Sequence, residues 1–403
     1  MMRPTSHPYW LDIPLLNGSS ERPGEGEIVI IGSGIAGVSS AYWLQQHGFR
    51  DITLLDFQPQ QAASFRNCGH VLYGTVESMQ ALVALHSEEQ AREVWQFSVD
   101  ICEELKQTIA RHDLEVDYRQ DGYLVIAVDA TEDNEIQQSI QLLQKHGFAS
   151  EYKTAKELQS LGFREVYGGR FEPGSAQVHP VKLRNALLQE VLKAGAKYHT
   201  GIEVTEVQDV QGKVEVQTKH HGRVHYQAAV IAANAYSPLL SRFFASHRLV
   251  EPFRGQIMTS RPLTENFAVT YPHSFDHGYE YALLTSDRRL MLGGWRNHTE
   301  GGEIGTYDIS PNPQVEQGLA EFAKKHYGFK EDLHWEYSWA GIMASSKTGF
   351  PFIGPTDSPL IFTVSGFTGH GLSWAHGSAK LLAGIIAGEP RPKLTHLFNP
   401  MQR

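Results

Sequence analysis

The strongest hydrophobic pattern in the chain lies between residues 27 and 56. A short apolar run at 28–31 predicts a buried parallel strand. Apolar residues then follow helical spacing as far as Gly48, which is suited to ending a helix. A second apolar run at 52–55 predicts another strand. The pattern therefore predicts a strand–helix–strand unit near the start of the fold.

The rest of the chain divides into helical and strand-like stretches. Helical spacing predicts helices over 78–113, 132–146, 150–161, 180–194, 311–326 and from the turn at 366–371 to residue 388. Strands are predicted at 118–128, 196–199, 202–207, 214–217, 224–227, 228–232 and 360–364. Alternating runs across 251–292 indicate an antiparallel sheet, whereas the glycine-rich range 168–179 predicts irregular backbone. Residues 1–26 are expected to form an extended arm, fixed to the surface by Tyr9 and Trp10.

A strand of the parallel type returns at 228–232, long after the first unit, so a second domain is expected to interrupt the first. We therefore expect an α/β fold (α+β overall) with a doubly wound domain on a parallel central sheet and a second domain on a mainly antiparallel sheet. The first should take 1–110, 165–245 and 339–403, and the second 111–164 and 246–338.

Composition narrows the class of protein. A chain of 403 residues with 41% hydrophobic and 20% charged residues is typical of a folded soluble protein of two or so domains. The net charge of −10 argues against nucleic acid or an anionic membrane as partner. Two cysteines, Cys68 and Cys102, exclude a disulfide framework and favour a reducing compartment. Because no apolar stretch approaches a bilayer span and 1–26 lacks a signal-peptide core, a cytoplasmic location is expected.

The turn of the first unit carries a recognisable glycine spacing. Gly32, Gly34 and Gly37 fit GxGxxG, in which the glycines permit a tight turn, close approach to a pyrophosphate and close helix–strand packing. Asp56, at the end of the second strand, is placed to accept hydrogen bonds from a ribose diol and disfavours a 2′-phosphate. This pattern predicts FAD or NAD binding, with NADP disfavoured.

Three separated segments, 32–37, 63–70 and 366–372, point to one ligand, and the last repeats the strand–glycine turn–helix pattern. With the motifs ASFRNCGH, QVHP, VIAANAYSP, TSDRRLMLGG, WAGIM, GFPFIGP and GFTGHG in this order, the chain resembles the FAD-dependent oxidoreductases of the D-amino-acid oxidase superfamily, which includes glycine and sarcosine oxidases. Within the superfamily, the motifs WAGIM and DRRLMLGG most resemble those of the γ-glutamylputrescine oxidase branch.

The resemblance implies a set of cofactor contacts. Residues matching the family's FAD-binding positions are Gly32, Gly34, Ile35, Ala36, Gly37, Asp56, Phe57, Ser64, Arg66, Asn67, Gly69, His70, Val204, Ala232, Gly341, Gly369, His370, Gly371 and Leu372. Ala344, Ser345 and Ser346 occupy the segment in which sarcosine-oxidase-type members attach FAD through cysteine, so noncovalent FAD is expected. Cys68 is expected to be a buried thiol.

Departures from the family bear on the substrate. Met343 stands where amino-acid oxidases place a carboxylate-binding arginine, and Met291 where sarcosine-oxidase-type members hold an oxygen-activating lysine. No catalytic residue is certain, and the candidates are Tyr281, Trp295, Trp339, Arg254 and His370. The histidines show no metal-ligand spacing such as HExxH, so no metal site is expected.

The resemblance implies FAD-dependent oxidation of the C–N bond of a primary or secondary amine, by hydride transfer to flavin N5 and hydrolysis of the imine. A γ-glutamylputrescine-like or other ω-amino compound is the expected substrate, with oxygen or another electron acceptor. One alternative is a D-amino-acid or N-methyl-amino-acid dehydrogenase that reduces a quinone or partner protein, with Arg254 or Arg296 binding the carboxylate. Another is a non-catalytic flavin-binding assembly protein. Binding of NAD alone is disfavoured by the Gly369–Gly371 turn.

Overall fold

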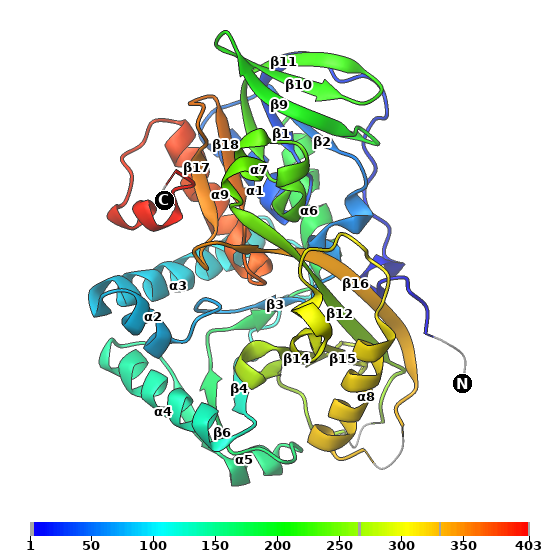
Figure 1. Ribbon diagram of the computed structural model, residues 1–403, viewed down its shortest axis with the longest axis vertical. Helices are drawn as coiled ribbons and strands as arrows, with labels where there is room; N and C mark the ends of the chain where they lie inside the picture. The colour runs from blue at the N-terminus through cyan, green and yellow to red at the C-terminus, as the bar shows by residue number, and fades with distance from the viewer. Residues whose placement is uncertain (1–3, 265–266, 330–331, 402–403) are drawn as a thin grey trace.

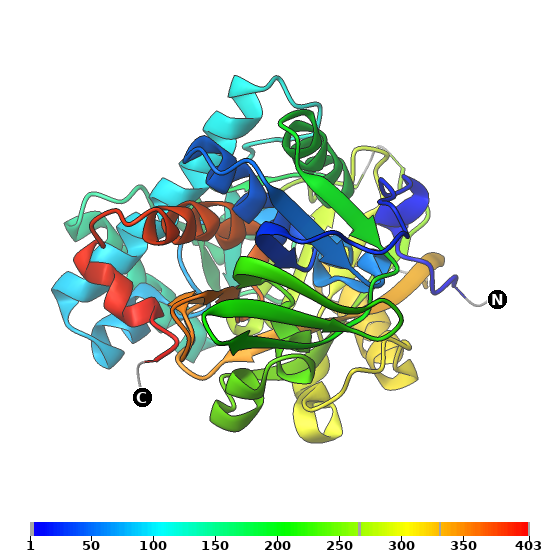
Figure 2. The ribbon, with the colours of Figure 1, turned by 90° about the horizontal axis from the view of Figure 1, so that it is seen from above.

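The computed structural model describes residues 4–264, 267–329 and 332–401, which build two eight-stranded sheets and their covering helices (Figure 1). The first sheet has the path β17-β18-β11-β1-β2-β8, with β9 and β10 attached to β11. Figure 2 shows the β9–β10–β11 ribbon (green) nearest the viewer when the molecule is seen from above. Its strands are β1 Gly26–Ile31, β2 Ile52–Asp56, β8 Lys197–Thr200, β9 Val204–Val210, β10 Lys213–Thr218, β11 Gly222–Ile231, β17 Phe352–Pro355 and β18 Ile361–Ser365.

The centre of this sheet is parallel and buried. β1 pairs in parallel with β2 and β11, and β18 and β8 extend the parallel order on either side. Strands covered on both faces read as continuous apolar runs, which is the pattern at 28–31 and 52–55. Helix α1 packs against α6 and α9, and α3 against α9. The bounds of these helices are α1 Ile35–Gln46, α3 Glu88–Arg111, α6 Pro180–Lys193 and α9 Gly371–Ile386.

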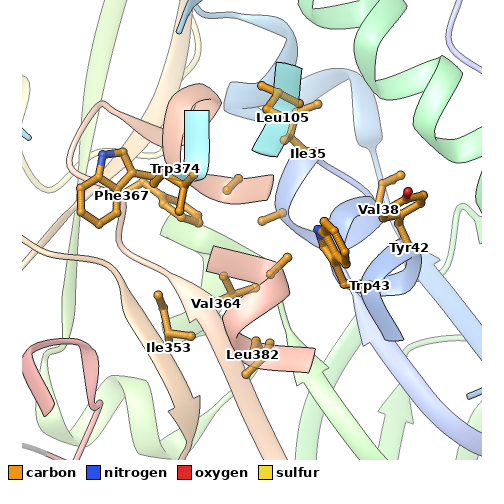
Figure 3. Close-up of a cluster of buried hydrophobic side chains, with 14 of the residues drawn as sticks. Ile35, Val38, Tyr42, Trp43, Leu105, Ile353, Val364, Phe367, Trp374 and Leu382 are labelled. Atoms are coloured by element: carbon orange, nitrogen blue, oxygen red, sulfur yellow. The ribbon is translucent and has the colours of Figure 1, made fainter. Parts of the chain in front are cut away.

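A hydrophobic core joins these helices to the edge of the sheet. Figure 3 shows Val38 and Trp43 from α1 facing the same cluster as Val364 from β18 and Leu382 from α9. Because α9 comes late in the chain and α1 early, this core holds together elements that are distant in sequence. This core therefore fixes the glycine turn before α1 and the glycine turn before α9 relative to the same sheet.

The second sheet runs β16-β12-β15-β14-β13-β4-β6-β5. β13 and β4 pair in parallel and the other recorded pairs are antiparallel, so the predicted mainly antiparallel sheet is confirmed. Its strands are β4 Tyr123–Ala127, β5 Glu151–Thr154, β6 Gly168–Glu172, β12 Val250–Ser260, β13 His273–Phe275, β14 Glu280–Leu284, β15 Leu290–Gly293 and β16 Trp335–Ser346. Other elements are α2 Met79–Leu85, α4 Ala130–Lys145, α5 Ala155–Ser160, α7 Arg242–His247, α8 Pro313–Tyr327 and the strand pair β3 His70–Val71 with β7 Ala176–Gln177.

Several local predictions were wrong. The helix predicted over 78–113 is interrupted, because Ser87 forms a capping box with Gln90 and starts a new helix. The range 150–161 begins with β5 before its short helix, since β5 finds a partner in β6. The range 168–179 is not irregular but contains β6 and β7. The two strands predicted at 224–227 and 228–232 form one strand, β11, which leaves the β10 hairpin and enters the parallel sheet.

The two sheets suggest where the chain divides into domains. β6 belongs to the antiparallel sheet, although 165–245 was assigned to the cofactor domain. The boundaries remain a prediction, and we propose to move the boundary at 165 past β6, to about residue 175. Among the described residues, no helix has both the length and the apolar character needed to cross a membrane.

One core histidine predicts acid sensitivity. The ring nitrogens of His376 lie 3.0 Å from Thr108 Oγ1 and 3.0 Å from Ser39 Oγ. Burial, aided by the charges of Lys380 and Arg111, lowers the pKa of His376 from 6.5 to about 3. The unfolded chain therefore binds this proton more readily, so stability is complete above pH 6.5 and declines as the pH falls towards 3. At pH 5 the loss from this group reaches at most about 2 kcal/mol.

The measurement is the free energy of unfolding in urea at pH 7.5 and pH 5. We expect His376→Gln, which keeps hydrogen-bonding groups, to lose less stability on acidification than the native protein. Other buried histidines with lowered pKa, such as His70 and His273, are common to both proteins and cancel in the comparison. An identical pH dependence in the two proteins would contradict this assignment.

Candidate cofactor and active site

A cavity of roughly 1150 Å³ lies between the two sheets. Its lining combines residues of the parallel sheet, such as Ile31 and Leu55, with residues of the antiparallel sheet, such as Tyr123 and Ile342. The two glycine turns and the loop at 63–70 all contribute to it. The three segments singled out in the sequence therefore meet around one space.

The first glycine turn leaves no room for side chains. Gly32 has a φ of +105°, and a Cβ there would lie 2.7 Å from the carbonyl oxygen of Ala232. A Cβ on Gly34 would lie 2.7 Å from Ser64 Oγ, which accepts a hydrogen bond from Ile35 N at 3.0 Å. A Cβ on Gly37 would lie 1.9 Å from the Gly32 oxygen. The turn thus presents backbone directly to the cavity at the start of α1, as a dinucleotide requires.

Asp56 lines the cavity and also fixes this turn. Its Oδ2 accepts hydrogen bonds from Ser33 N at 2.6 Å and Ser33 Oγ at 2.8 Å. Burial raises the pKa of Asp56, while the Ser33 hydrogen bonds and the charge of Arg184 oppose that shift. Arg184, fully buried on α6, donates to Ser33 O at 2.9 Å and to Tyr198 Oη at 2.6 Å. Sequence reasoning missed Arg184, because nothing in its helix distinguishes it from a surface arginine.

The loop at 63–70 is held from two sides. The indole nitrogen of Trp10 donates to Asn67 O at 2.7 Å, and that of Trp339 donates to Arg66 O at 3.2 Å. Arg66 Nη1 donates to Ala340 O at 2.6 Å, which ties the loop to β16. Asn67 Oδ1 accepts from Gly69 N at 2.8 Å. The N-terminal arm, expected to be fixed by Tyr9 and Trp10, therefore supports the site.

Two neutral histidines border the cavity. Burial, with His273 nearby, lowers the pKa of His70 to about 3, and burial lowers the pKa of His370 as well. His70 Nε2 is buried and has no hydrogen-bond partner among the described residues. The His70 ring lies 5.1 Å from Tyr123 and 6.4 Å from Tyr281, both in edge-on contact. His70 thus lines the cavity, while its Nε2 itself is shielded from the cavity by the surrounding protein.

Most predicted cofactor residues line the cavity. They are Gly32, Gly34, Ile35, Ala36, Asp56, Phe57, Ser64, Arg66, Asn67, His70, Val204, Ala232, Gly341, Gly369, His370, Gly371 and Leu372. Gly37 and Gly69 lie outside the lining, where Gly37 allows α1 to pack on the turn and Gly69, at φ +84°, allows the loop to bend. Of the catalytic candidates, Tyr281 and His370 line the cavity.

The structure does not bring the other three candidates into the lining. Arg254 is engaged in ion pairs with Glu303 and Asp308. Trp295 packs on α8 at Gly318 and on His298, with a centroid distance of 4.1 Å to the latter ring. Trp339 is fully buried behind the loop it supports. We therefore assign structural roles to these three residues.

Sequence reasoning missed a charged pair on the part of the cavity wall that the antiparallel sheet forms. Arg170 and Glu172 project from β6 into the cavity, with Arg170 Nη1 4.0 Å from Glu172 Oε2. The guanidinium also lies 5.3 Å from the centroid of Trp95. Burial lowers the pKa of Arg170 and raises that of Glu172, while each opposes the shift of the other. The available signal was their spacing of two, which places both side chains on one face of a strand.

A search of protein-family models finds one match, the FAD dependent oxidoreductase family (DAO), over residues 27–385. Among curated proteins, the probable oxidoreductase OrdL of Haemophilus influenzae is 23% identical over 90% of this chain and 83% of its own. The γ-glutamylputrescine oxidoreductase of Escherichia coli is 24% identical over 90% of this chain and 84% of its own. Among solved structures, glycine oxidase from Geobacillus kaustophilus is 18% identical with a TM-score of 0.79, covering 94% and 100% of the two chains.

Proposed function

Because this chain belongs to the FAD-dependent oxidoreductase family, we propose that its substrate is a primary or secondary amine whose C–N bond it oxidises. The favoured substrate is a γ-glutamylated amine or another ω-amino compound. Two observations support the proposal: the cavity reaches from the glycine turns to Arg170 and Glu172, and relatives of comparable length include the γ-glutamylputrescine oxidoreductase.

The residues present fit FAD. The tight turn at Gly32 and Gly34 would take the pyrophosphate, and Asp56 the adenosine ribose. The loop containing Arg66 and His70, with the turn before α9, would hold the flavin. When bound, FAD supplies the two-electron oxidation chemistry. The protein's part is to bind the amine, orient its C–H bond and exclude water.

The pair on β6 suits one end of such a substrate. A γ-glutamyl amine carries an α-carboxylate and an α-ammonium at one end and its oxidisable amine at the other. Arg170 would take the carboxylate and Glu172 the ammonium, which are the charge-assisted contacts that each group forms best. At the flavin end, Tyr281 and Tyr123 line the cavity and offer aromatic surface to an alkyl amine. Met343, also in the lining, cannot bind a carboxylate there.

The proposal is tested by anaerobic mixing of the yellow protein with γ-glutamyl amines, simple diamines, D-amino acids, N-methyl amino acids and 2-hydroxy acids. Bleaching of the flavin band near roughly 450 nm is expected with amines, and strongest with γ-glutamyl amines. Bleaching with 2-hydroxy acids alone contradicts the amine assignment. Tight FAD binding with no bleaching by any compound favours the non-catalytic assembly role. Readmission of air then shows whether oxygen or another molecule accepts the electrons.

A second candidate is an amino-acid dehydrogenase. One observation favours it: the guanidinium of Arg296 lines the cavity between the rings of Phe253 and Tyr279, with centroid distances of 4.5 and 5.1 Å. Arg296 Nη1 donates to Gly302 O at 3.3 Å, and its other guanidinium N–H groups would be open to a substrate carboxylate in the cavity. Arg254, the other arginine considered, is engaged elsewhere. Substituting Arg296 should then raise KM for amino acids and leave simple amines unchanged.

We further propose that the FAD is bound noncovalently. Cys68 lines the cavity, but burial raises the pKa of its thiol, so the reactive thiolate is disfavoured. Acid precipitation of the purified protein should leave a yellow supernatant and a colourless pellet. Cys68→Ala should behave identically, with unchanged FAD content. A yellow pellet that turns colourless only in Cys68→Ala would establish a covalent bond instead.

A further inference from the structure

Three potential metal ligands meet beside the cavity, outside the cofactor segments. Asp276 and Glu280 flank the turn between β13 and β14, and His298 follows β15. One ligand atom from each residue lies within 4.8 Å of the other two. The pairing of β14 with β15 holds the two segments side by side.

The buried member of this cluster lacks a partner. Glu280 is 1% exposed, and its Oε1 accepts from Trp295 N at 3.2 Å. Its Oε2 is buried without a hydrogen-bond donor among the described residues. Asn297 bridges two members of the cluster through its amide nitrogen, because Nδ2 donates to Asp276 Oδ2 at 2.9 Å and lies 3.3 Å from His298 Nε2. A buried carboxylate oxygen without a donor is costly in free energy unless a cation serves it.

The surroundings add negative charge. Glu132 and Glu135 from α4 approach the same turn, where Glu132 Oε1 accepts from His277 N at 2.6 Å. His277 pairs with Glu135 at 3.1 Å. His277 Nδ1 also lies 3.6 Å from Asp276 Oδ1, so one imidazole faces the carboxylates of Asp276, Glu132 and Glu135 and offsets only part of their charge.

We propose that Asp276, Glu280 and His298 bind a divalent transition-metal cation, Zn²⁺ or Mn²⁺. An imidazole combined with carboxylate oxygens suits these ions, whereas Ca²⁺ and Mg²⁺ prefer all-oxygen sites. Bond lengths near 2 Å require the ligand atoms, which lie within 4.8 Å of one another, to draw closer together around the ion. This inference revises the expectation of no metal site.

The cation would connect two walls of the cavity. His277, Gly278 and Tyr279 line it on one side of the cluster, and Gly294 and Arg296 on the other. A metal joining these two segments fixes their separation, and with it the width of the cavity at this end. Since none of the ligands lines the cavity itself, the role is to position the wall.

The test uses the FAD-loaded protein, free of any affinity tag and treated with a chelator. Calorimetric titration with MnCl₂, and separately with ZnCl₂, should show one saturable site. His298→Gln and Glu280→Gln should weaken that site at least about tenfold. Glu300→Gln is the matched control, because it removes an exposed carboxylate two residues beyond His298 and outside the cluster. His298 is exposed, so its variant should fold normally.

A second readout is thermal. Mn²⁺ should raise the Tm of the native protein and of Glu300→Gln but not that of Glu280→Gln, since a ligand that binds only the folded state stabilises it. Equal affinity in the native protein and both ligand variants overturns the proposal, and so does the absence of a saturable site. Binding of Ca²⁺ or Mg²⁺ as tight as that of Mn²⁺ overturns the choice of metal.

Discussion

Gly37→Ala is expected to abolish stable FAD binding and to lower the free energy of unfolding by roughly 1–3 kcal/mol or more. The new Cβ would lie 1.9 Å from the backbone oxygen of Gly32, and backbone cannot turn aside as a side chain can. Either α1 moves away from β1 or the turn opens, and both displace the N–H groups that face the pyrophosphate. The measurements are the ratio of flavin to protein absorbance after purification and the midpoint of urea unfolding.

Two further glycine-to-alanine variants serve as controls for Gly37→Ala. Gly24→Ala adds the same methyl where nothing lies within 4 Å, so neither quantity should change. Gly34→Ala meets only the Ser64 side chain, which can rotate, so it should reduce FAD content with a smaller loss of stability. Full FAD content in Gly37→Ala would show that the turn accommodates the methyl group and that its packing role is overstated.

The second large effect is expected at Arg170. Arg170→Met should raise KM for γ-glutamyl amines by about tenfold to a hundredfold, with little change for simple diamines. Removing a charged partner from a buried hydrogen bond costs about 1.5–3 kcal/mol, and this cost falls only on substrates that carry a carboxylate. The value of kcat should change little, because Arg170 is proposed to hold the end of the substrate that does not react.

The variant also leaves Glu172 buried without its partner, which can destabilise the protein by itself. Glu172→Gln combined with Arg170→Met removes that cost, and the same selective rise in KM should persist. Arg223→Met, on the exposed face of the β9–β10–β11 ribbon, is the control and should leave both substrate classes unaffected. If KM rises equally for diamines, the pair on β6 does not recognise the amino-acid end.

Helices and strands could be predicted from the sequence where their own residues carry a clear apolar pattern. The strand at 28–31 and the helix after it are covered by neighbours on every side, so they read as continuous apolar stretches that can be recognised locally. β6 could not be recognised in the same way, because it is short and glycine-rich and its register comes from β4 and β5. Because β6 was not predicted, Arg170 and Glu172 were not predicted as site residues either. Their side chains come to lie on one face only when the strand forms.

The residues of the candidate site also divide into those predictable from local motifs and those that depend on distant partners. The cofactor residues come from local motifs, and nearly all of them line the cavity. Arg254 looked available in the sequence, but its partners Glu303 and Asp308 lie about fifty positions away along the chain. Trp295 and Trp339 are aromatic residues near the cavity whose rings are taken up by packing and by a backbone hydrogen bond. Contacts with residues far away in the sequence cannot be predicted from the local sequence.

The late position of β18 and α9 has a consequence for biosynthesis. β18 completes the parallel sheet beside β11, and the turn before α9 forms part of the cavity wall. A nascent chain on the ribosome has made the first glycine turn long before residues 361–386 emerge. The nucleotide-binding half therefore stays open through most of translation, with the α9 face of α1 exposed and in need of protection from aggregation. FAD can be captured fully only after this last helix has left the exit tunnel.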